Sequence, residues 1–293
     1  MSIIAFGTTR ILVQGITGTM ARHHTGNMLA YGSRIVAGVR PGSAGQEVHG
    51  VPVFDSVAEA RARYNIDASI LFVPPKGVKD SALEALRNGV KLLVIVTEHV
   101  PLRDAMIIME EKARHGAVII GPNTPGLISP AEKCLLGFMP GRYFRPGPVG
   151  LASRSGTLTY EFVSRLTAAG IGQSTCIGVG GDRIVGLRFR EALEFFERDD
   201  QTKAVLLVGE IGGTMEEEAA ELVASGAIRK PVIAYVAGHT APEGTKLGHA
   251  GAIVDGSRGT TTGKIEALRR AGIYLARRPA EAIELARTVL EKK

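Results

Sequence analysis

The chain has 293 residues, of which 45% are hydrophobic and 37 are glycines, which indicates a globular protein of about two domains at roughly 150 residues each. The net charge is +6, but the basic residues form no long tract and tryptophan is absent, so we expect no nucleic-acid binding. With no apolar run of the roughly 18–20 residues that span a bilayer, no secretory signal and no disulfide pattern, we expect a cytoplasmic protein.

The first half of the chain alternates apolar runs with amphipathic segments. Buried strands are predicted at Arg10–Gln14, Arg34–Val39, Ala68–Val73, Lys91–Val96 and Ala117–Ile120. Helices are predicted at His24–Tyr31, Val57–Tyr64, Lys79–Asn88 and Leu102–His115. Near-continuous apolar strands that alternate with helices indicate a parallel sheet covered on both faces. We therefore predict an α/β fold with a Rossmann-like domain over residues 1–125.

Residues 126–147 are rich in proline and glycine and are predicted to connect two domains. A second α/β series follows over residues 148–293, for which we predict a flavodoxin-like domain with a parallel sheet. Its strands are expected at Val149–Ala152, Gln173–Ile177, Ala204–Val208, Val232–Val236 and Ala252–Val254. Its helices are expected at Thr157–Ala168, Leu187–Arg198, Met215–Ser225 and Ala280–Glu291.

A glycine turn lies where the first predicted strand passes into a helix. Gly15 and Gly18 would let the backbone approach an anionic group, which the helix N-terminus would attract. The spacing is G-x-x-G-x-x-A, and no acidic residue follows the second strand to bind the ribose of NAD. The turn therefore favours a phosphate-bearing nucleotide other than NAD, although a tight turn without any ligand remains open.

Three glycine-containing motifs fall at predicted strand ends of the second domain, where open α/β sheets bind ligands. They are SRSGT at 153–157, GEIGG at 209–213 and GHAGA at 248–252. His249 could carry a phosphoryl group covalently, with Glu210 orienting its ring and Ser155 and Gly156 holding the anion. From spacing alone, His249 could equally be a solvated loop histidine.

Along almost its whole length, the chain resembles the α subunits of the succinyl-CoA synthetase (succinate–CoA ligase) family. The segments that carry the resemblance include QGITG, ASILFVPP, VTEHVP, SRSGTLTYE, GEIGG and GHAGAI. The resemblance implies that the first domain binds coenzyme A and that the second carries the phosphohistidine. It also implies a separate β subunit whose ATP-grasp site binds ATP or GTP with Mg²⁺, in an αβ or α2β2 assembly.

Site residues follow from the resemblance by position. His249 would be phosphorylated, Glu210 would be its carboxylate partner, and Ser155 and Gly156 would bind the phosphohistidine. Coenzyme A would contact Thr17, Gly18, Thr19, Met20, Ser43, Val96, Thr97 and Glu98. Tyr160 would contact the organic acid, and no metal-ligating set is expected within this chain. The implied reaction forms succinyl-CoA reversibly through an acyl phosphate.

Five positions depart from the family pattern. Ala21 replaces the last glycine of the turn and Thr124 replaces a cysteine of some relatives, and the other three bear on ligand binding. Ser43 replaces a lysine that would pair with a coenzyme A phosphate, and Arg40 replaces a threonine, so we expect Arg40 to compensate as a coenzyme A contact. Arg183 replaces a proline in the loop near the acid site. This leaves related acyl-CoA ligases open as alternatives, acting on malate, citrate or acetate. A non-catalytic regulatory module that binds coenzyme A is the remaining alternative.

Overall fold

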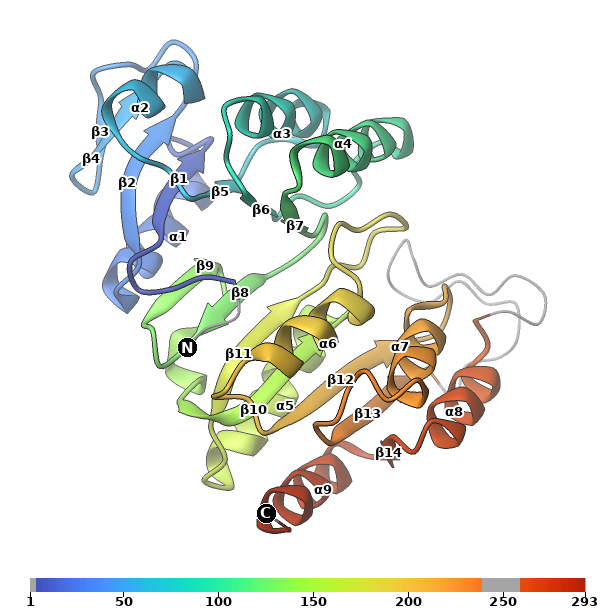
Figure 1. The fold of residues 1–293 in the computed structure, drawn as a ribbon. Helices are drawn as coiled ribbons and strands as arrows, with labels where there is room; N and C mark the ends of the chain where they lie inside the picture. Colours follow the sequence, from blue (N-terminus) through green and yellow to red (C-terminus); the bar gives the residue numbers. More distant parts are fainter. Residues whose placement is uncertain (1–3, 239–258, 293) are drawn as a thin grey trace.

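The computed structural model describes residues 4–238 and 259–292, which form two α/β units, each built around one sheet (Figure 1). The strands of the first sheet are β1 (Arg10–Gln14), β2 (Arg34–Val39), β3 (Glu47–Val48), β4 (Val51–Phe54), β5 (Ala68–Leu71), β6 (Leu92–Ile95) and β7 (Val118–Ile120). Their order is β3-β4-β2-β1-β5-β6-β7, and only the pairing of β3 with β4 is antiparallel. Without β3, this is the 3-2-1-4-5-6 order of a Rossmann fold, which confirms the prediction.

The second sheet also combines a parallel core with an antiparallel edge. Its strands are β8 (Gly126–Ser129), β9 (Cys134–Gly137), β10 (Pro146–Ser153), β11 (Gln173–Gly178), β12 (Ala204–Glu210), β13 (Val232–Ala237) and β14 (Tyr274–Ala276). The order is β14-β13-β12-β10-β11-β8-β9. The five strands from β10 to β14 are parallel and follow the 2-1-3-4-5 order of flavodoxin, as the sequence predicted.

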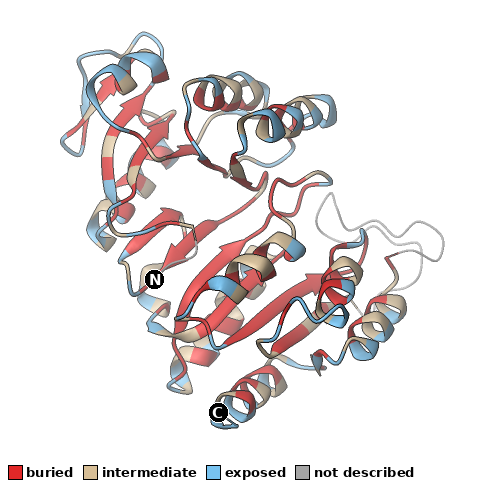
Figure 2. Ribbon diagram, viewed as in Figure 1, coloured by how far each residue is buried: buried red, intermediate tan, exposed pale blue. Residues whose placement is uncertain are grey.

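Helices pack on the sheets and bury the strands (Figures 1 and 2). They are α1 (Thr19–Tyr31), α2 (Val57–Arg63), α3 (Val78–Arg87), α4 (Leu102–His115), α5 (Gly156–Ala168), α6 (Phe189–Arg198), α7 (Met215–Ala224), α8 (Thr261–Arg270) and α9 (Pro279–Glu291), with short 3₁₀ helices η1 (Pro75–Gly77) and η2 (Gly141–Tyr143). Every residue of β5, β6, β11 and β12 is buried, as expected for strands covered on both faces. None of the described helices is long and apolar enough to cross a bilayer.

Helix boundaries follow local sequence signals where a cap is present. Helix α4 ends at Gly116, whose φ of 55° places it in the left-handed region and whose N–H is bonded to the carbonyl of Ala113, the usual role of glycine after a helix. Helix α1 begins at Thr19, five residues earlier than predicted, because Gly18 is its N-cap. Its first turn is largely exposed, and apolar periodicity therefore did not reveal it.

The segment predicted as a connector differs from the prediction. Residues 126–147 contain β8 and β9, which extend the second sheet through antiparallel pairing of β8 with β11. Both strands have four residues, all buried. Strands this short form because they pair with distant residues, and local sequence carries little sign of that pairing. The proline and glycine content of the segment therefore led to the prediction of a loop.

The carboxyl ends of β7 and β11 lie side by side where the two units meet. The N–H of Gly121, just after β7, donates to the carbonyl of Val179 after β11 over 3.2 Å. The N–H of Gly186 donates back to the carbonyl of Gly121 over 2.8 Å. Because ligands of such sheets bind at carboxyl ends, the ligand-binding edges of the two units adjoin each other.

Candidate functional site

The glycine turn after β1 has the geometry of an anion-binding turn. Gly15 has a φ of 77°, and a Cβ built on it would lie 2.5 Å from the carbonyl oxygen of Phe72, so only glycine fits. Gly18 starts α1 without any side-chain cap, which leaves the first N–H groups of the helix available to an anion.

A cavity of about 430 Å³ opens beside this turn. Its wall includes Gly18 and Arg40 among the predicted coenzyme A contacts. A second cavity, of about 360 Å³, is lined by three more of them, Met20, Val96 and Thr97. Among the described residues, the other predicted contacts line neither of these two cavities: Thr17, Thr19, Ser43 and Glu98.

The loop after β2 holds Arg40 and Ser43. The backbone N–H groups of Ser43 and Ala44 both donate to Oδ1 of Asp55 over 2.9 Å. Asp55 therefore accepts hydrogen bonds from two backbone N–H groups of this turn. One of them belongs to Ser43, which stands where the family has a lysine. Arg40 lies at the cavity with an exposed side chain, and it is the cation of this loop that can reach an anionic ligand there.

In the second unit, the SRSG motif joins β10 to α5. Ser155 is the N-cap of α5, and its Oγ accepts the N–H of Leu158 over 3.3 Å. Ser153 fixes the turn, because its Oγ donates to the carbonyl of Ser155 and accepts the N–H of the same residue. A hydroxyl that accepts one bond can still donate its hydrogen, so Ser155 can contact an anion at the N-terminus of α5.

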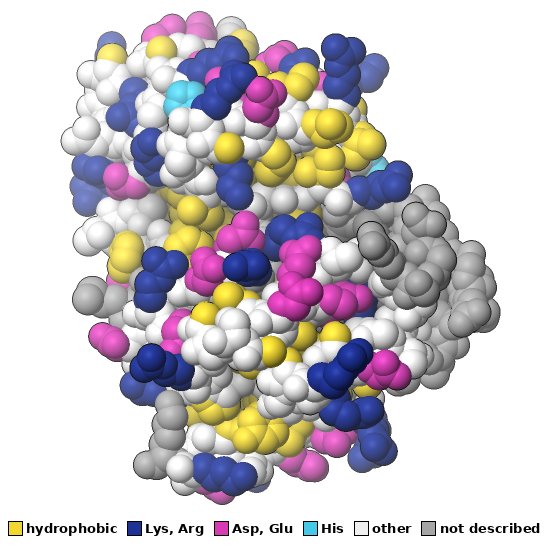
Figure 3. Space-filling model, turned by 45° about the vertical axis from the view of Figure 1, so that its right-hand side comes forward, with side chains coloured by type: hydrophobic (Ala, Val, Ile, Leu, Met, Phe, Trp, Pro, Cys, Tyr) yellow, Lys and Arg dark blue, Asp and Glu magenta, His cyan; other side chains and the backbone are white. Residues whose placement is uncertain are grey.

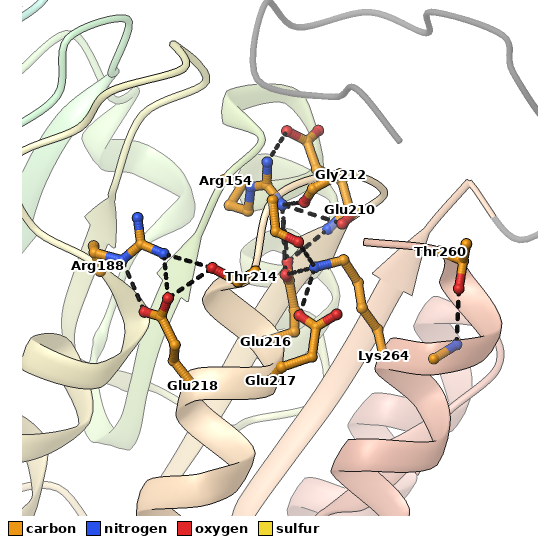
Figure 4. Close-up of polar contacts among 12 residues, drawn as sticks. Arg154, Arg188, Glu210, Gly212, Thr214, Glu216, Glu217, Glu218, Thr260 and Lys264 are labelled. Atoms are coloured by element: carbon orange, nitrogen blue, oxygen red, sulfur yellow. Dashed lines mark hydrogen bonds and ion pairs between the residues drawn. The ribbon is translucent and has the colours of Figure 1, made fainter. Parts of the chain in front are cut away.

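Glu210 ends β12 and is joined to the SRSG motif through Arg154, which is buried (Figure 4). Nη2 of Arg154 lies 3.3 Å from Oε1 of Glu210, and its Nη1 donates to the carbonyls of Glu210 and Gly212. The predicted carboxylate partner and the predicted anion cradle are therefore brought together by one arginine.

Glu216, at the start of α7, completes this arrangement. Its Oε1 accepts the N–H of Glu210 over 3.1 Å and pairs with Nη1 of Arg154 at 3.2 Å. Lys264 of α8 is fully buried, contacts Oε2 of Glu216, and donates to Glu217 over 2.9 Å and to the carbonyl of Gly213 over 3.0 Å. Two cations and three carboxylates thus form one network, shown in Figure 4, of which only Glu217 is partly exposed.

Electrostatics keeps this network charged. Burial acts to raise the pKa of Glu216, but Arg154 and Lys264 outweigh it and hold that pKa below its ordinary value. An ionised Glu216 in turn offsets part of the cost of burying the side chains of Arg154 and Lys264.

On the face shown in Figure 3, the surface Lys and Arg side chains are spread among Asp and Glu rather than gathered in one patch.

His249 and the strand predicted at 252–254 lie outside the described residues. Gly259, the first described residue after them, accepts the N–H of Gly212 over 2.8 Å. Tyr160 lies on the second turn of α5, half-buried, and burial raises its pKa to about 12. Among the described residues, no group of three or more His, Cys, Asp or Glu side chains is arranged to hold a metal ion.

Sequence reasoning assigned no role to Arg154, Glu216 or Lys264. A signal was present in the first two, since Arg154 lies inside SRSG and Glu216 follows GEIGG in an acidic run. Lys264 lies in α8, a helix that was not predicted, and a helical lysine is usually solvated. Its complete burial against carboxylates depends on the packing of α8 on α7, which local sequence does not reveal.

Comparison with known families matches most of the chain. Residues 6–99 match the family described as CoA binding domain, and residues 152–274 match the family described as CoA-ligase. Subunit alpha 2 of the ADP-forming succinate–CoA ligase of Archaeoglobus fulgidus is 50% identical over 290 residues, which cover 99% of this chain and 100% of the relative. The α subunit of Methanothermobacter thermautotrophicus is 51% identical over 282 residues, which cover 96% of this chain and 95% of the relative.

Among solved structures, ATP citrate lyase from Methanothrix soehngenii, in complex with citrate and coenzyme A, has a TM-score of 0.90. Its identity to this chain is 24%, and the match covers 99% of this chain and 51% of the lyase chain. At that identity the likeness shows the fold alone, namely two α/β units in the same arrangement.

Proposed function

This chain belongs to the family of succinate–CoA ligase α subunits, and from that premise we propose that it forms succinyl-CoA from succinate, coenzyme A and ATP, reversibly, together with a β subunit. The relatives named above are ADP-forming, which favours ATP over GTP. Their designation as α subunits implies the β partner, to which we assign the ATP-grasp site with its Mg²⁺.

We divide the work of this chain between its two units. The first unit matches a CoA binding domain, and we assign the nucleotide end of coenzyme A to the cavity beside Gly18 and Arg40. In the second unit, His249 takes the γ-phosphoryl group of ATP and releases ADP. Glu210 orients the imidazole, while Ser155 and the N–H of Gly156 stabilise the phosphoryl oxygens at the N-terminus of α5.

Two further transfers complete the reaction. A carboxylate oxygen of succinate attacks the phosphorus, which frees His249 and forms succinyl phosphate. The thiol sulfur of coenzyme A then attacks the acyl carbon, loses its proton and displaces phosphate. Tyr160 on α5 is the proposed contact for the acid. The adjoining carboxyl ends of β7 and β11 support transfer between the two units without release of the intermediate.

One observation carries the proposal: Arg154 joins the SRSG motif to Glu210 in one buried network. A module that only bound coenzyme A would have no need for a buried charged network in its other domain, because burying charges is costly.

The test is phosphorylation in the assembled αβ complex. With ATP labelled at the γ-phosphate, we expect one acid-labile phosphate per α chain, absent in His249→Asn and released by succinate plus coenzyme A. A complex that turns over ATP through its β subunit but never labels this chain would contradict the proposal. Malate, citrate and acetate in the same release assay test the alternative acids. These acids are worth testing because Arg183, which replaces the family proline, is exposed beside the buried Asp182.

A further inference from the structure

A third cavity lies at the edge of the first sheet that is opposite the glycine turn. Its volume is about 680 Å³, and its wall includes Arg10, Arg34 and Leu92, the first residues of β1, β2 and β6. The cavity at the glycine turn instead includes Gln14, the last residue of β1. Because β1 has five residues, the two edges lie roughly 13 Å apart. The third cavity is therefore separate from both cavities described above.

Both units contribute apolar side chains to this cavity. Phe6, which is exposed, lines it from the segment before β1, and Phe195 lines it from α6 of the second unit. The segment that carries Phe6 is attached to the second unit, because the N–H of Gly7 donates to Oε2 of Glu132 over 3.1 Å in the turn between β8 and β9. The wall thus offers aromatic rings from two sides of the junction to an apolar ligand.

Three cations line the cavity, and only one of them is neutralised. Nε and Nη2 of Arg10 donate to the two carboxylate oxygens of Asp67 over 2.8 and 2.7 Å. The guanidinium of Arg34 is exposed and makes no hydrogen bond or ion pair to residues 4–238 or 259–292. Lys91 is also exposed, and its Nζ donates to the carbonyl of His115 over 2.6 Å, which leaves two of its three hydrogens for a ligand.

Arg34 and Lys91 lie at two different ends of this cavity. Arg34 begins β2 and Lys91 directly precedes β6, and the strand order β2-β1-β5-β6 places three strand spacings between them, which is about 14 Å. The pair of Arg10 and Asp67 occupies the edge between them, because Arg10 begins β1 and Asp67 directly precedes β5. The two cations can therefore bind two separate acidic groups of one ligand.

We propose that this cavity binds an organic dianion whose two acidic groups are joined by an elongated apolar or aromatic body. The acidic groups pair with Arg34 and Lys91, and the body packs against Phe6 and Phe195. Ligands of open α/β sheets usually bind at the carboxyl ends of the strands, whereas this site lies at the amino ends. It is a second ligand site, and it does not depend on the proposed reaction.

The test uses two probes that differ by one acidic group, biphenyl-4,4′-dicarboxylate and biphenyl-4-carboxylate. Both are titrated by calorimetry into the αβ complex in the presence of saturating coenzyme A, which keeps the probes out of the coenzyme A site. We expect both to bind, and we expect the dicarboxylate to bind about 5-fold more tightly, the size of effect expected for one exposed ion pair.

Variants of the two cations assign this difference to the cavity. Arg34→Gln should abolish the advantage of the dicarboxylate and leave the affinity for the monocarboxylate nearly unchanged, because Lys91 still binds its single acidic group. Lys91→Gln should behave in the same way, and its amide can still donate to the carbonyl of His115. Phe6→Ala should weaken both probes equally, because it removes a contact with the body that they share.

Arg103→Gln is the matched control, because Arg103 is an exposed arginine of α4 outside the wall of this cavity. This variant should bind both probes as the wild type does. Three outcomes would overturn the proposal. They are the absence of dicarboxylate binding, equal affinities of the wild type for the two probes, and an advantage of the dicarboxylate that persists in Arg34→Gln. Labelling of His249, which tests the proposed function, is measured independently of all three.

Discussion

Oε1 of Glu216 lies 3.2 Å from Nη1 of Arg154, and neither side chain exposes more than 3% of its surface. The same oxygen accepts the N–H of Glu210, so a single carboxylate fixes the arginine of one motif and the backbone of the other. Gly209 makes this possible, because a Cβ at that position would collide with the Glu216 carboxylate. Glu216 therefore positions the backbone of Glu210 and the guanidinium of Arg154.

Removal of this carboxylate should destabilise the chain strongly. Glu216→Ala leaves Arg154 and Lys264 buried without their shared partner, and breaking a buried ion pair in this way costs about 3–5 kcal/mol. Glu217→Ala is the matched control, because Glu217 contacts Lys264 but is 26% exposed, and its loss should cost about 1 kcal/mol or less. Urea unfolding measures both, and equal losses in the two variants would show that the buried network contributes no special stability.

The same residue should give the protein an acid-sensitive stability. Against the effect of burial, Arg154 and Lys264 hold the folded pKa of Glu216 below its ordinary value of 4.5. Its contribution is therefore present above about pH 4.5 and is lost as the pH falls through the folded pKa. Glu216→Gln should flatten this acid decline in a series of urea unfolding curves. A variant that lost stability as steeply as the wild type would place the acid sensitivity elsewhere.

Parts of this architecture could be predicted from sequence, because they depend on local pattern. The strand β1 and the helix α4 have the predicted bounds, and apolar runs between amphipathic segments gave both parallel sheets. By contrast, β8 and the buried position of Lys264 depend on contacts with distant residues. The role of Ser155 as a helix cap was also missed, although serine before a helix is a known signal.

Gly15 should be irreplaceable for a steric reason and not for its backbone angle alone. Gly15→Ala adds a Cβ 2.5 Å from the Phe72 carbonyl, whereas Gly226 has the same φ of 77° and nothing within 4 Å of its Cβ position. Gly226→Ala should cost about 1–2 kcal/mol from backbone strain. Gly15→Ala should cost more and also weaken coenzyme A binding, since the turn must shift. Unfolding and calorimetry on both variants decide this, and matching behaviour would contradict it.

Arg40 should replace the lysine that this chain lacks at Ser43. A charge-assisted hydrogen bond contributes about 1.5–3 kcal/mol, so Arg40→Ala should weaken coenzyme A binding by roughly 10-fold or more. Adding Ser43→Lys to that variant should restore most of the affinity, because the cation returns to the same loop. Dephospho-coenzyme A should be less sensitive if the 3′-phosphate is the partner. Unchanged coenzyme A affinity in Arg40→Ala would refute the compensation.

Ser155 should combine a structural role with a chemical one, and substitutions can separate them. Ser155→Ala removes the cap of α5 and should cost about 1 kcal/mol, as should Ser56→Ala, which removes the equivalent cap of α2. Only the first should slow phosphorylation of His249, because Ser56 lies in the other unit. Ser155→Asp keeps a capping oxygen but places a negative charge at the anion cradle, so it should retain stability and lose labelling. A Ser155→Asp chain that labelled normally would remove Ser155 from the phosphate site and leave it a helix cap.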